Sequence, residues 1–557
     1  MLNKSGAVIV LIVIFWGGRI YADASHVAIA SAHPLATNAG FEILAKGGNV
    51  FDAAVAVSAA LAVVEPAGSG LGGGGYWLLH REKDGFETMI DGREKAPMAA
   101  HKNMFLDKQG RVIPGLSRDG ALAAAIPGMP AALVHLSEKY GRLSLAESLA
   151  PAIRQAQTGF AIGEKYNKLL KFRAEVVKKN PQTARIFLNK GKLPKTYSIL
   201  RQPELAYTLK QLAKSGRGGF YSGEVAKKLV NGVSKAGGIW TKEDLASYQV
   251  VEREPVRGEY HGMKITSAAP SSSGGIVLIE ALNILSAYDL KNADEITRKH
   301  LIVEAMRRAY HDRALYLGDA DFVDLPVRHL LNGDYAAGLR SSIRQDKALP
   351  SNMLSGYLQP QPEGDNTTHF SIIDNEGNRV AATLSINLPF GSGFVAAGTG
   401  VLLNDEMDDF VALPGAMNSY GLVGGVANAI APGKRMLSSM TPAFLEDRSR
   451  VAVLGTPGGS RIISMVLLAA LDFAQGNGPD SWVREPRFHH QFIPDVVEYE
   501  KDAMTANEVT DLAAMGHTMK EARYRYGDMQ AVQWNKITHA LTAASDRRGE
   551  GRAIAGH

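Results

Sequence analysis

The chain has 557 residues, of which 45% are hydrophobic and 21% are charged. A chain of this length and composition can bury a large core, which excludes disorder as its main state. The formal net charge of +5 is a mild excess without a long basic run, so no nucleic-acid partner is expected. The sequence has no cysteine, which excludes a structural disulfide, a thiolate zinc site and a cysteine nucleophile.

Residues 1–24 have the features of an export signal. A single lysine precedes the apolar run 7–16, which is too short for an ordinary membrane span. Ala22 and Ala24 then form the small-x-small pattern that a signal peptidase recognises. We therefore predict a cleaved signal peptide and a mature periplasmic protein, without a membrane span, that starts near Ser25. An uncleaved anchor and a secreted protein are the alternatives.

The first part of the chain reads as a mixture of helices and strands. An alanine- and valine-rich helix is predicted over 38–64, followed by strands over 76–80 and 87–94. Residues 130–230 have mostly helical patterns, and the longest amphipathic helix is predicted over 295–317.

The second part of the chain is richer in strands. Residues 345–366 contain many Pro, Gly, Ser, Gln and Asn residues and predict a surface loop or linker. A hairpin follows over 368–387 with its turn at 375–378, and a second hairpin is predicted over 443–455. Thr367 lies at the junction between the linker and the first of these hairpins.

Several common motifs of enzyme sites do not fit this chain. The glycine run 68–75 follows a helix and leads into a strand, so it predicts tight backbone packing rather than a phosphate-binding loop. His489 and His490 are adjacent, which is not the spacing of a metal-binding pair. The sequence neither indicates nor excludes a Ser-His-Asp triad. We expect no metal and no organic cofactor.

Thr367 admits two interpretations. In an intact chain its hydroxyl is a poor nucleophile, and the segment could be a turn that feeds an edge strand. At the start of a chain, its own α-amino group, with an ordinary pKa of about 7.7–8.0, could act as the base. That would require cleavage of the bond between Asn366 and Thr367. The residues around Thr367 do not by themselves decide between the two.

A resemblance to a known family favours the second interpretation. The stretch DNTTHFSIID at 365–374 resembles the processing site of γ-glutamyltranspeptidases. Other segments resemble the same family in the family's order, over essentially the whole mature chain: 68–77 (GSGLGGGGYW), 91–97 (DGREKAP), 316–322, 383–393, 404–410, 418–425, 434–442, 455–462 (GTPGGSRI) and 485–490.

The resemblance implies an α/β (α+β) fold, the four-layer αββα sandwich of the N-terminal-nucleophile hydrolases. It implies a large subunit over 25–366 and a small subunit over 367–557, which form a heterodimer. Thr367 would be the nucleophile of both autoprocessing and catalysis, and Ser385 would support it. Gly458 and Gly459 would offer backbone N–H groups to the oxyanion.

The resemblance also implies how the amino-acid end of a substrate is held. Arg93, Ser438 and Ser439 would bind the α-carboxylate, and Asn387, Glu406 and Asp409 would bind the α-ammonium. Taken singly, the same residues could be a surface ion pair, a helix cap or a turn residue. Position 406 is Glu where some bacterial relatives have Gln, and we expect a carboxylate there still to favour an ammonium group. Tyr420 matches a lid loop, as a gate or as a hydrophobic plug.

We therefore expect a γ-glutamyltransferase and glutathione hydrolase. Its partners would be glutathione and other γ-glutamyl compounds, with amino acid or peptide acceptors. One alternative is an acylase of the same fold that acts on a different side-chain amide. Another is an exported binding protein that stays unprocessed and keeps the pocket.

Overall fold

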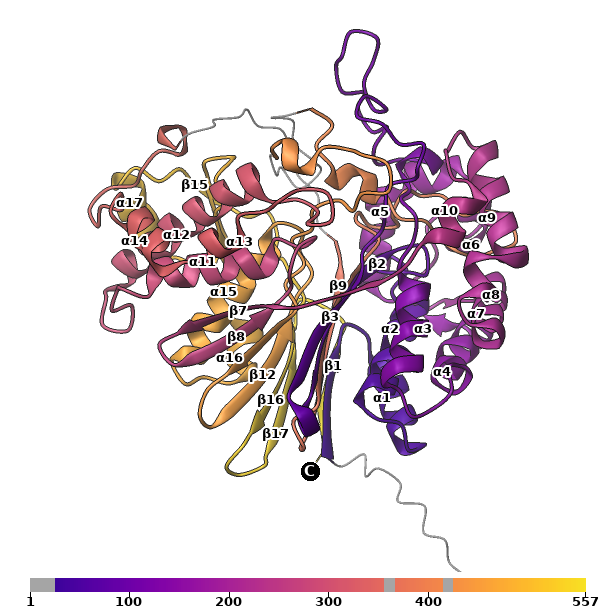
Figure 1. The fold of residues 1–557 in the computed structure, drawn as a ribbon, viewed down its shortest axis with the longest axis horizontal. Coiled ribbons are helices and arrows are strands. Elements are labelled where there is room, and N and C mark those ends of the chain that lie inside the picture. The colour runs from indigo at the N-terminus through magenta and orange to yellow at the C-terminus, as the bar shows by residue number, and fades with distance from the viewer. Residues whose placement is uncertain (1–25, 355–365, 414–423, 557) are drawn as a thin grey trace, which may run out of the picture.

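The computed structural model describes residues 26–354, 366–413 and 424–556. Two large β-sheets pack face to face in the centre, and a layer of helices covers the outer face of each sheet (Figure 1). This is the predicted four-layer sandwich. Among the described residues, no helix has the length and apolarity needed to cross a bilayer.

The first sheet has seven strands, and neighbouring strands run antiparallel. Its order is β18 (Arg552–Ala555), β1 (Val27–Ser31), β9 (Thr368–Asp374), β10 (Arg379–Ser385), β2 (Gly74–Arg81), β3 (Phe86–Gly92) and β6 (Val251–Arg253). Strands from both sides of Thr367 therefore belong to one sheet, and β9 and β10 lie between β1 and β2.

The second sheet has six strands and is also antiparallel. Its order is β17 (Leu541–Ser545), β16 (Gln530–Asn535), β12 (Arg450–Gly455), β11 (Ala443–Glu446), β8 (Met263–Ser267) and β7 (Val256–Tyr260). Two small sheets lie outside the sandwich core: β13 (Phe488–His489), β14 (Val497–Tyr499) and β15 (Met519–Glu521), and β4 (Phe160–Ala161) with β5 (Ile199–Leu200).

The two helical layers come from different parts of the chain (Figure 1). The layer beside the seven-stranded sheet contains α1 (Pro34–Ala45), α2 (Val50–Val64), α3 (Met129–Tyr140), α4 (Leu145–Thr158), α5 (Glu164–Lys179), α6 (Pro181–Phe187), α7 (Pro203–Ser215), α8 (Gly218–Tyr221), α9 (Gly223–Lys235) and α10 (Lys242–Ser247). The layer beside the six-stranded sheet contains α11 (Gly274–Leu285), α12 (Glu295–Tyr316), α13 (Val327–Leu330), α14 (Gly333–Arg340), α15 (Arg461–Ala474), α16 (Pro479–Arg484) and α17 (Ala506–Ala514).

Strand β9 shows how the period-two pattern builds the layers. Phe370 and Ile372 belong to the apolar cluster beneath α2, whereas Ile373 faces the cluster between the two sheets. Since β9 pairs with β1 on one side and β10 on the other, it is an interior strand. The interpretation of this segment as an edge strand is therefore wrong, and both predicted hairpins are confirmed.

Two predictions about helices are corrected. The single helix expected over 38–64 is two helices, because Gly47 takes a φ of +91° and Asn49 starts α2 with a capping box to Asp52. The helix expected over 295–317 is present as α12, but it is not amphipathic, because every residue from Lys299 to Ala314 is buried. Neighbouring elements cover α12 on all sides, and its buried charged residues form ion pairs or hydrogen bonds with their neighbours.

The glycine run packs against the end of β10 and against the loop that contains Leu402. A Cβ atom on Gly72 would lie 2.0 Å from the carbonyl oxygen of Leu402, and one on Gly73 would lie 2.1 Å from that of Ser385. Only glycine permits so close an approach of two backbones. The prediction of tight backbone packing is confirmed.

Candidate active site

Thr367 directly precedes β9 and is 4% exposed. Its Oγ1 donates a hydrogen bond to the carbonyl oxygen of Asn366. This carbonyl belongs to the peptide bond that the sequence analysis expects to break. The hydroxyl group thus lies against the carbonyl group that it would attack.

The loop after α2 holds the backbone on both sides of that bond. Asn366 donates its Nδ2 hydrogen to the carbonyl oxygen of Ala67, and Thr368 donates its hydroxyl to the carboxylate of Glu65. The Nζ atom of Lys165 in α5 forms ion pairs with Glu65 Oε1 at 2.7 Å and with Asp528 Oδ2 at 2.8 Å. Glu65 was not predicted as a site residue, because a glutamate at the end of a helix has no distinctive pattern.

Ser385, Asn387 and the glycine pair come together beside Thr367. Ser385 is the last residue of β10, and its Oγ accepts a hydrogen bond of 2.8 Å from the backbone N–H of Asn387. Gly458 and Gly459 have φ values of +141° and +57°, and α15 starts two residues later at Arg461. The glycine pair therefore lies next to the N-terminal end of α15, which is the positive end of the helix dipole.

Arg93 makes direct contact with two carboxylates that were expected to bind an ammonium group. Its NH1 lies 2.6 Å from Glu406 Oε2, and its NH2 lies 2.5 Å from Asp409 Oδ2. Both acids come from the short 3-10 helix η5 (Glu406–Asp409). A third carboxylate, Glu94 Oε2, lies 3.5 Å from the same guanidinium.

Three carboxyl groups in this cluster share one arginine. Burial raises the pKa of Glu94 well above its ordinary value, and Glu406 adds to that effect. Burial also raises the pKa of Asp409 to about 7, although Arg93 opposes the increase. A cation bound beside these acids would favour their ionised forms over the protonated ones.

The serine pair lines the same pocket, just after Met436, whose carbonyl oxygen accepts a hydrogen bond of 3.3 Å from Arg93 Nε. The Oγ of Ser438 accepts a hydrogen bond of 3.1 Å from the backbone N–H of Met440. The Oγ of Ser439 accepts one of 3.1 Å from Arg313 in α12. Arg313 was missed by the sequence analysis, because it is one of several arginines in a helix whose burial the local pattern does not indicate.

These elements enclose one small pocket between segments from both sides of Thr367. Two of the predicted residues, Gly458 and Glu406, do not line this pocket, although Glu406 is hydrogen-bonded to Arg93. Tyr420 is outside the described residues. The pocket is lined by Arg93, Arg313, Thr367, Ser385, Asn387, Asp409, Leu437, Ser438, Ser439, Met440, Gly459 and Ile462.

Comparison with known proteins shows the family. The family model for gamma-glutamyltranspeptidase matches residues 36–556. The chain belongs to the gamma-glutamyltranspeptidase family. The glutathione hydrolase proenzyme of Pseudomonas sp. strain A14 is 44% identical over 493 residues, which cover 88% of this chain and 85% of that protein. The glutathione hydrolase proenzyme of Escherichia coli K12 is 41% identical, with coverages of 95% and 91%.

Solved structures agree with the assignment to the gamma-glutamyltranspeptidase family. A cephalosporin acylase from Bacillus halodurans superposes with a TM-score of 0.83 at 28% identity, and the match covers 95% of each chain. A chain of the Helicobacter pylori gamma-glutamyltranspeptidase gives a TM-score of 0.57 at 44% identity, covering 58% of this chain and 94% of that one. The predicted family and fold are confirmed.

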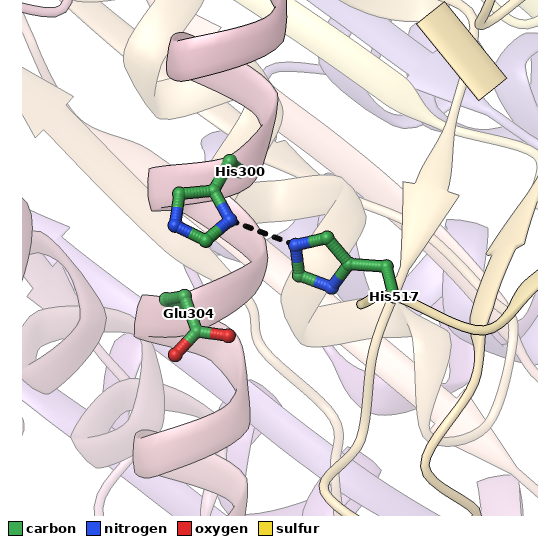
Figure 2. A group of neighbouring side chains, drawn as sticks. All are labelled: His300, Glu304 and His517. Atoms are coloured by element: carbon green, nitrogen blue, oxygen red, sulfur yellow. Dashed lines mark hydrogen bonds between the residues drawn. The ribbon is translucent and has the colours of Figure 1, made fainter. Parts of the chain in front are cut away.

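This gamma-glutamyltranspeptidase family member has a second polar cluster, away from the pocket, in which His300, Glu304 and His517 approach one another (Figure 2). Their donor atoms are close enough for a metal ion, but His300 Nδ1 and His517 Nε2 are hydrogen-bonded to each other at 2.8 Å. Arg307 and Arg308 form ion pairs with the carboxylate of Glu304 at 3.1 and 2.7 Å. Their positive charges would repel a bound metal cation. We interpret the cluster as a buried network that joins α12 to the segment before β15.

Proposed function

We propose that this protein is an autoprocessed γ-glutamyltransferase and glutathione hydrolase in which Thr367 is the nucleophile. One observation carries the proposal. The buried hydroxyl of Thr367 touches the Asn366 carbonyl at the edge of a pocket that presents both acidic and basic side chains. The relatives named glutathione hydrolase proenzymes, at 41–44% identity, support the same conclusion.

In the processing step, the Thr367 hydroxyl attacks the carbonyl carbon of Asn366. The C–N bond breaks as the C–O bond forms, so the amide becomes an ester between the two residues. Water then hydrolyses the ester, which leaves a carboxylate on Asn366 and a free α-amino group on Thr367. The contacts of Asn366 with Ala67 and of Thr368 with Glu65 support this step, because they hold both sides of the bond in place.

In the catalytic step, the freed α-amino group takes the proton of the Thr367 hydroxyl as the oxygen attacks the γ-carbonyl of the substrate. Gly458 and Gly459 would stabilise the oxyanion through backbone N–H groups, with help from the positive end of α15. The proton passes to the departing amine as the C–N bond breaks. The resulting γ-glutamyl ester is transferred to water or to an acceptor amine.

The pocket supports recognition of an amino-acid end. The carboxylate of Asp409 and its acidic neighbours, together with the Asn387 side chain, suit an α-ammonium group. The hydroxyls of Ser438 and Ser439 and the nearby arginines suit an α-carboxylate. Arg93 would contribute to the binding of both groups. It orients Glu406 and Asp409 for the α-ammonium group, and it faces the pocket where the α-carboxylate would bind.

Two further features belong to this proposal. Cleavage before Thr367 would leave a heterodimer of 25–366 and 367–557, held together by the pairing of β1 with β9 and of β2 with β10. The signal-like residues 1–24, which lie outside the described residues, support export to the periplasm with secretion as the alternative.

An acylase that acts on other side-chain amides is the second candidate. It is favoured by the close match of the B. halodurans cephalosporin acylase over 95% of the chain. Turnover of glutaryl amides without turnover of γ-glutamyl amides would select it, because a glutaryl group lacks the ammonium.

The decisive experiment is a denaturing gel of the purified protein with N-terminal sequencing of each band. We expect a large fragment and a small fragment that begins Thr-Thr-His-Phe, together with hydrolysis of a γ-glutamyl anilide. Thr367→Ala should give a single chain without activity, and Thr367→Ser should still process slowly. A stable single chain from the wild type would favour the binding-protein alternative, and normal turnover by Thr367→Ala would refute the mechanism.

A further inference from the structure

A chain of polar contacts starts beside Thr367 and runs through three charged side chains. Thr368 donates its hydroxyl to Glu65, and Lys165 Nζ lies 2.7 Å from Glu65 Oε1 and 2.8 Å from Asp528 Oδ2. The side chains of Glu65 and Asp528 are 9% and 3% exposed. Within the part of the chain that the structure describes, Lys165 is the only cation that forms an ion pair with either acid.

The far end of this chain of contacts reaches the loop with the glycine pair. The backbone N–H of Asp528 donates a hydrogen bond of 3.1 Å to Thr456 Oγ1. The same hydroxyl group donates one of 3.0 Å to the carbonyl oxygen of Pro457. Gly458 and Gly459 follow directly in the sequence. The contacts therefore connect the residue after the nucleophile with the loop that would form the oxyanion hole. We call these contacts the Lys165 bridge.

The first turn of α5 fixes the backbone from which the lysine side chain extends. Lys165 is the second residue of this helix, and the next residue, Tyr166, is buried. The ring of Tyr166 packs edge-on against Phe390 with 5.5 Å between the ring centres. Its hydroxyl donates a hydrogen bond of 3.2 Å to the carbonyl oxygen of Phe187. These contacts hold the start of α5 in place.

The ammonium group of Lys165 lies between two like charges. Glu65 and Asp528 each present an oxygen to it, and two carboxylates so close would repel each other without a cation between them. Burial raises the pKa of Asp528 to about 6, although Lys165 opposes the increase, and Glu65 adds to it. Lys165 therefore sets the separation of the two acids, and with it the separation of the backbone segments that they hold.

The Lys165 bridge also joins the two sides of the proposed cleavage site. Glu65 and Lys165 precede that site in the sequence, whereas Thr368 and Asp528 follow it. The contacts do not include the peptide bond that would be cut, so cleavage leaves them in place. The same bridge is therefore available in the processing step and in the later catalytic step.

We propose that Lys165 is a positioning residue that holds the nucleophile and the oxyanion loop at the separation that both reactions need. The inference rests on the proposed function and adds to it a residue that touches no reacting atom. Because Lys165 does not line the pocket, its loss should slow the chemical step and leave substrate binding intact. A displacement of about 1 Å between reacting groups can lower a rate about 100-fold.

The test is the steady-state kinetics of processed Lys165→Met with a γ-glutamyl anilide. Methionine keeps a long side chain but removes the charge. We expect kcat to fall about 10- to 100-fold, while KM stays within about twofold of the wild type. The small fragment should also appear more slowly on a denaturing gel.

The double variant Lys165→Met with Asp528→Asn separates positioning from packing. Asparagine keeps the shape of Asp528 and removes the charge that would repel Glu65, so most of the lost kcat should return. A lysine that only contributed to packing would leave the double variant at least as impaired as the single one. Lys168→Met is the matched control, since Lys168 is an exposed lysine of the same helix, and it should behave like the wild type.

An unchanged kcat in Lys165→Met would overturn the proposal, and so would a rise in KM alone. A double variant without recovery would overturn it as well and show a role in stability only. If Lys165→Met does not fold or process, the double variant decides: a processed, active enzyme supports the proposal, and an inactive one overturns it. Failure of the underlying function looks different, because the wild type itself would then not hydrolyse the γ-glutamyl anilide.

Discussion

The guanidinium of Arg93 donates to the carboxylate of Asp409 over 2.5 Å, and this contact joins segments that are far apart in the sequence. Arg93 follows β3, whereas Asp409 ends the 3-10 helix η5 after the proposed cleavage site. The resemblance assigned these residues to opposite ends of the substrate. Their direct contact means that a change in one alters the charge and position of the other.

Replacement of Arg93 should therefore affect both stability and binding. Arg93→Ala leaves Glu406, Asp409 and Glu94 without their shared cation, and we expect a loss of about 3–5 kcal/mol in the free energy of unfolding. KM for a γ-glutamyl anilide should also rise about tenfold or more. Denaturant unfolding and steady-state kinetics on the processed enzyme measure the two effects.

A double variant separates these two effects of Arg93. Arg93→Ala with Glu406→Gln removes one of the stranded charges, so part of the stability should return while KM stays high. Recovery of KM together with stability would mean that Arg93 acts only through folding. An unchanged KM in Arg93→Ala would argue against any role in binding.

Asp409 should make substrate binding depend on pH. Burial raises its pKa to about 7, and only the ionised form attracts an ammonium group. The inhibition constant of free glutamate should therefore fall, meaning tighter binding, as the pH rises from about 6 to about 8. In Asp409→Asn the binding should be weaker and nearly independent of pH over this range.

The same shift predicts the opposite trend for stability. The folded state holds a proton on Asp409 that the unfolded chain has released above its ordinary pKa of 3.8. The contribution of Asp409 to the free energy of unfolding is therefore fully present below about pH 4 and is lost as the pH rises through about 7. A difference between wild type and Asp409→Asn that does not grow over this interval would contradict the assigned pKa.

Glu65→Gln should slow autoprocessing. The substitution keeps the shape of the side chain but weakens the hydrogen bond from Thr368 and the 2.7 Å ion pair with Lys165. Because Lys165 keeps Asp528 at 2.8 Å, the stability loss should be limited to about 1–3 kcal/mol. The rate at which the small fragment appears on a gel measures the effect.

Glu550→Gln is the control for that experiment. Glu550 accepts a 3.0 Å hydrogen bond from the backbone N–H of Lys165, but it does not touch the segment around Thr367. It should process like the wild type. Equal processing rates for Glu65→Gln and Glu550→Gln would show that the Thr368 contact does not position the nucleophile.

Gly73→Ala should destabilise the protein and impair the site. The new Cβ atom would lie 2.1 Å from the carbonyl oxygen of Ser385, so the end of β10 must shift away. We expect a loss of about 1–3 kcal/mol or more, with reduced processing, measured by thermal unfolding and by gel. Gly338→Ala is the control, because that position in α14 has no atom within 4 Å of the added Cβ, and alanine there should be neutral or stabilising. Similar unfolding midpoints for the two variants would contradict the packing argument.

The sequence alone determined the family, the class of fold and the features that depend on neighbouring residues. The hairpins around residues 375–378 and 443–455 were predicted correctly, because their alternation and turn residues are local signals. The prediction of one continuous helix failed where a helical sequence pattern contains a local signal for a helix end. The helix over 38–64 reads as continuous until the φ of Gly47 and the cap at Asn49 are known.

Only the tertiary structure decided which charges meet. In the structure, β9 is an interior strand and α12 is buried on every side. Arg93 donates a hydrogen bond to Asp409, and Arg313 faces the pocket with serine hydroxyls as its hydrogen-bond partners. The physical reason is that burial and charge pairing depend on contacts between segments hundreds of residues apart. Periodicity and composition report the propensity of each segment but not which segment packs against it.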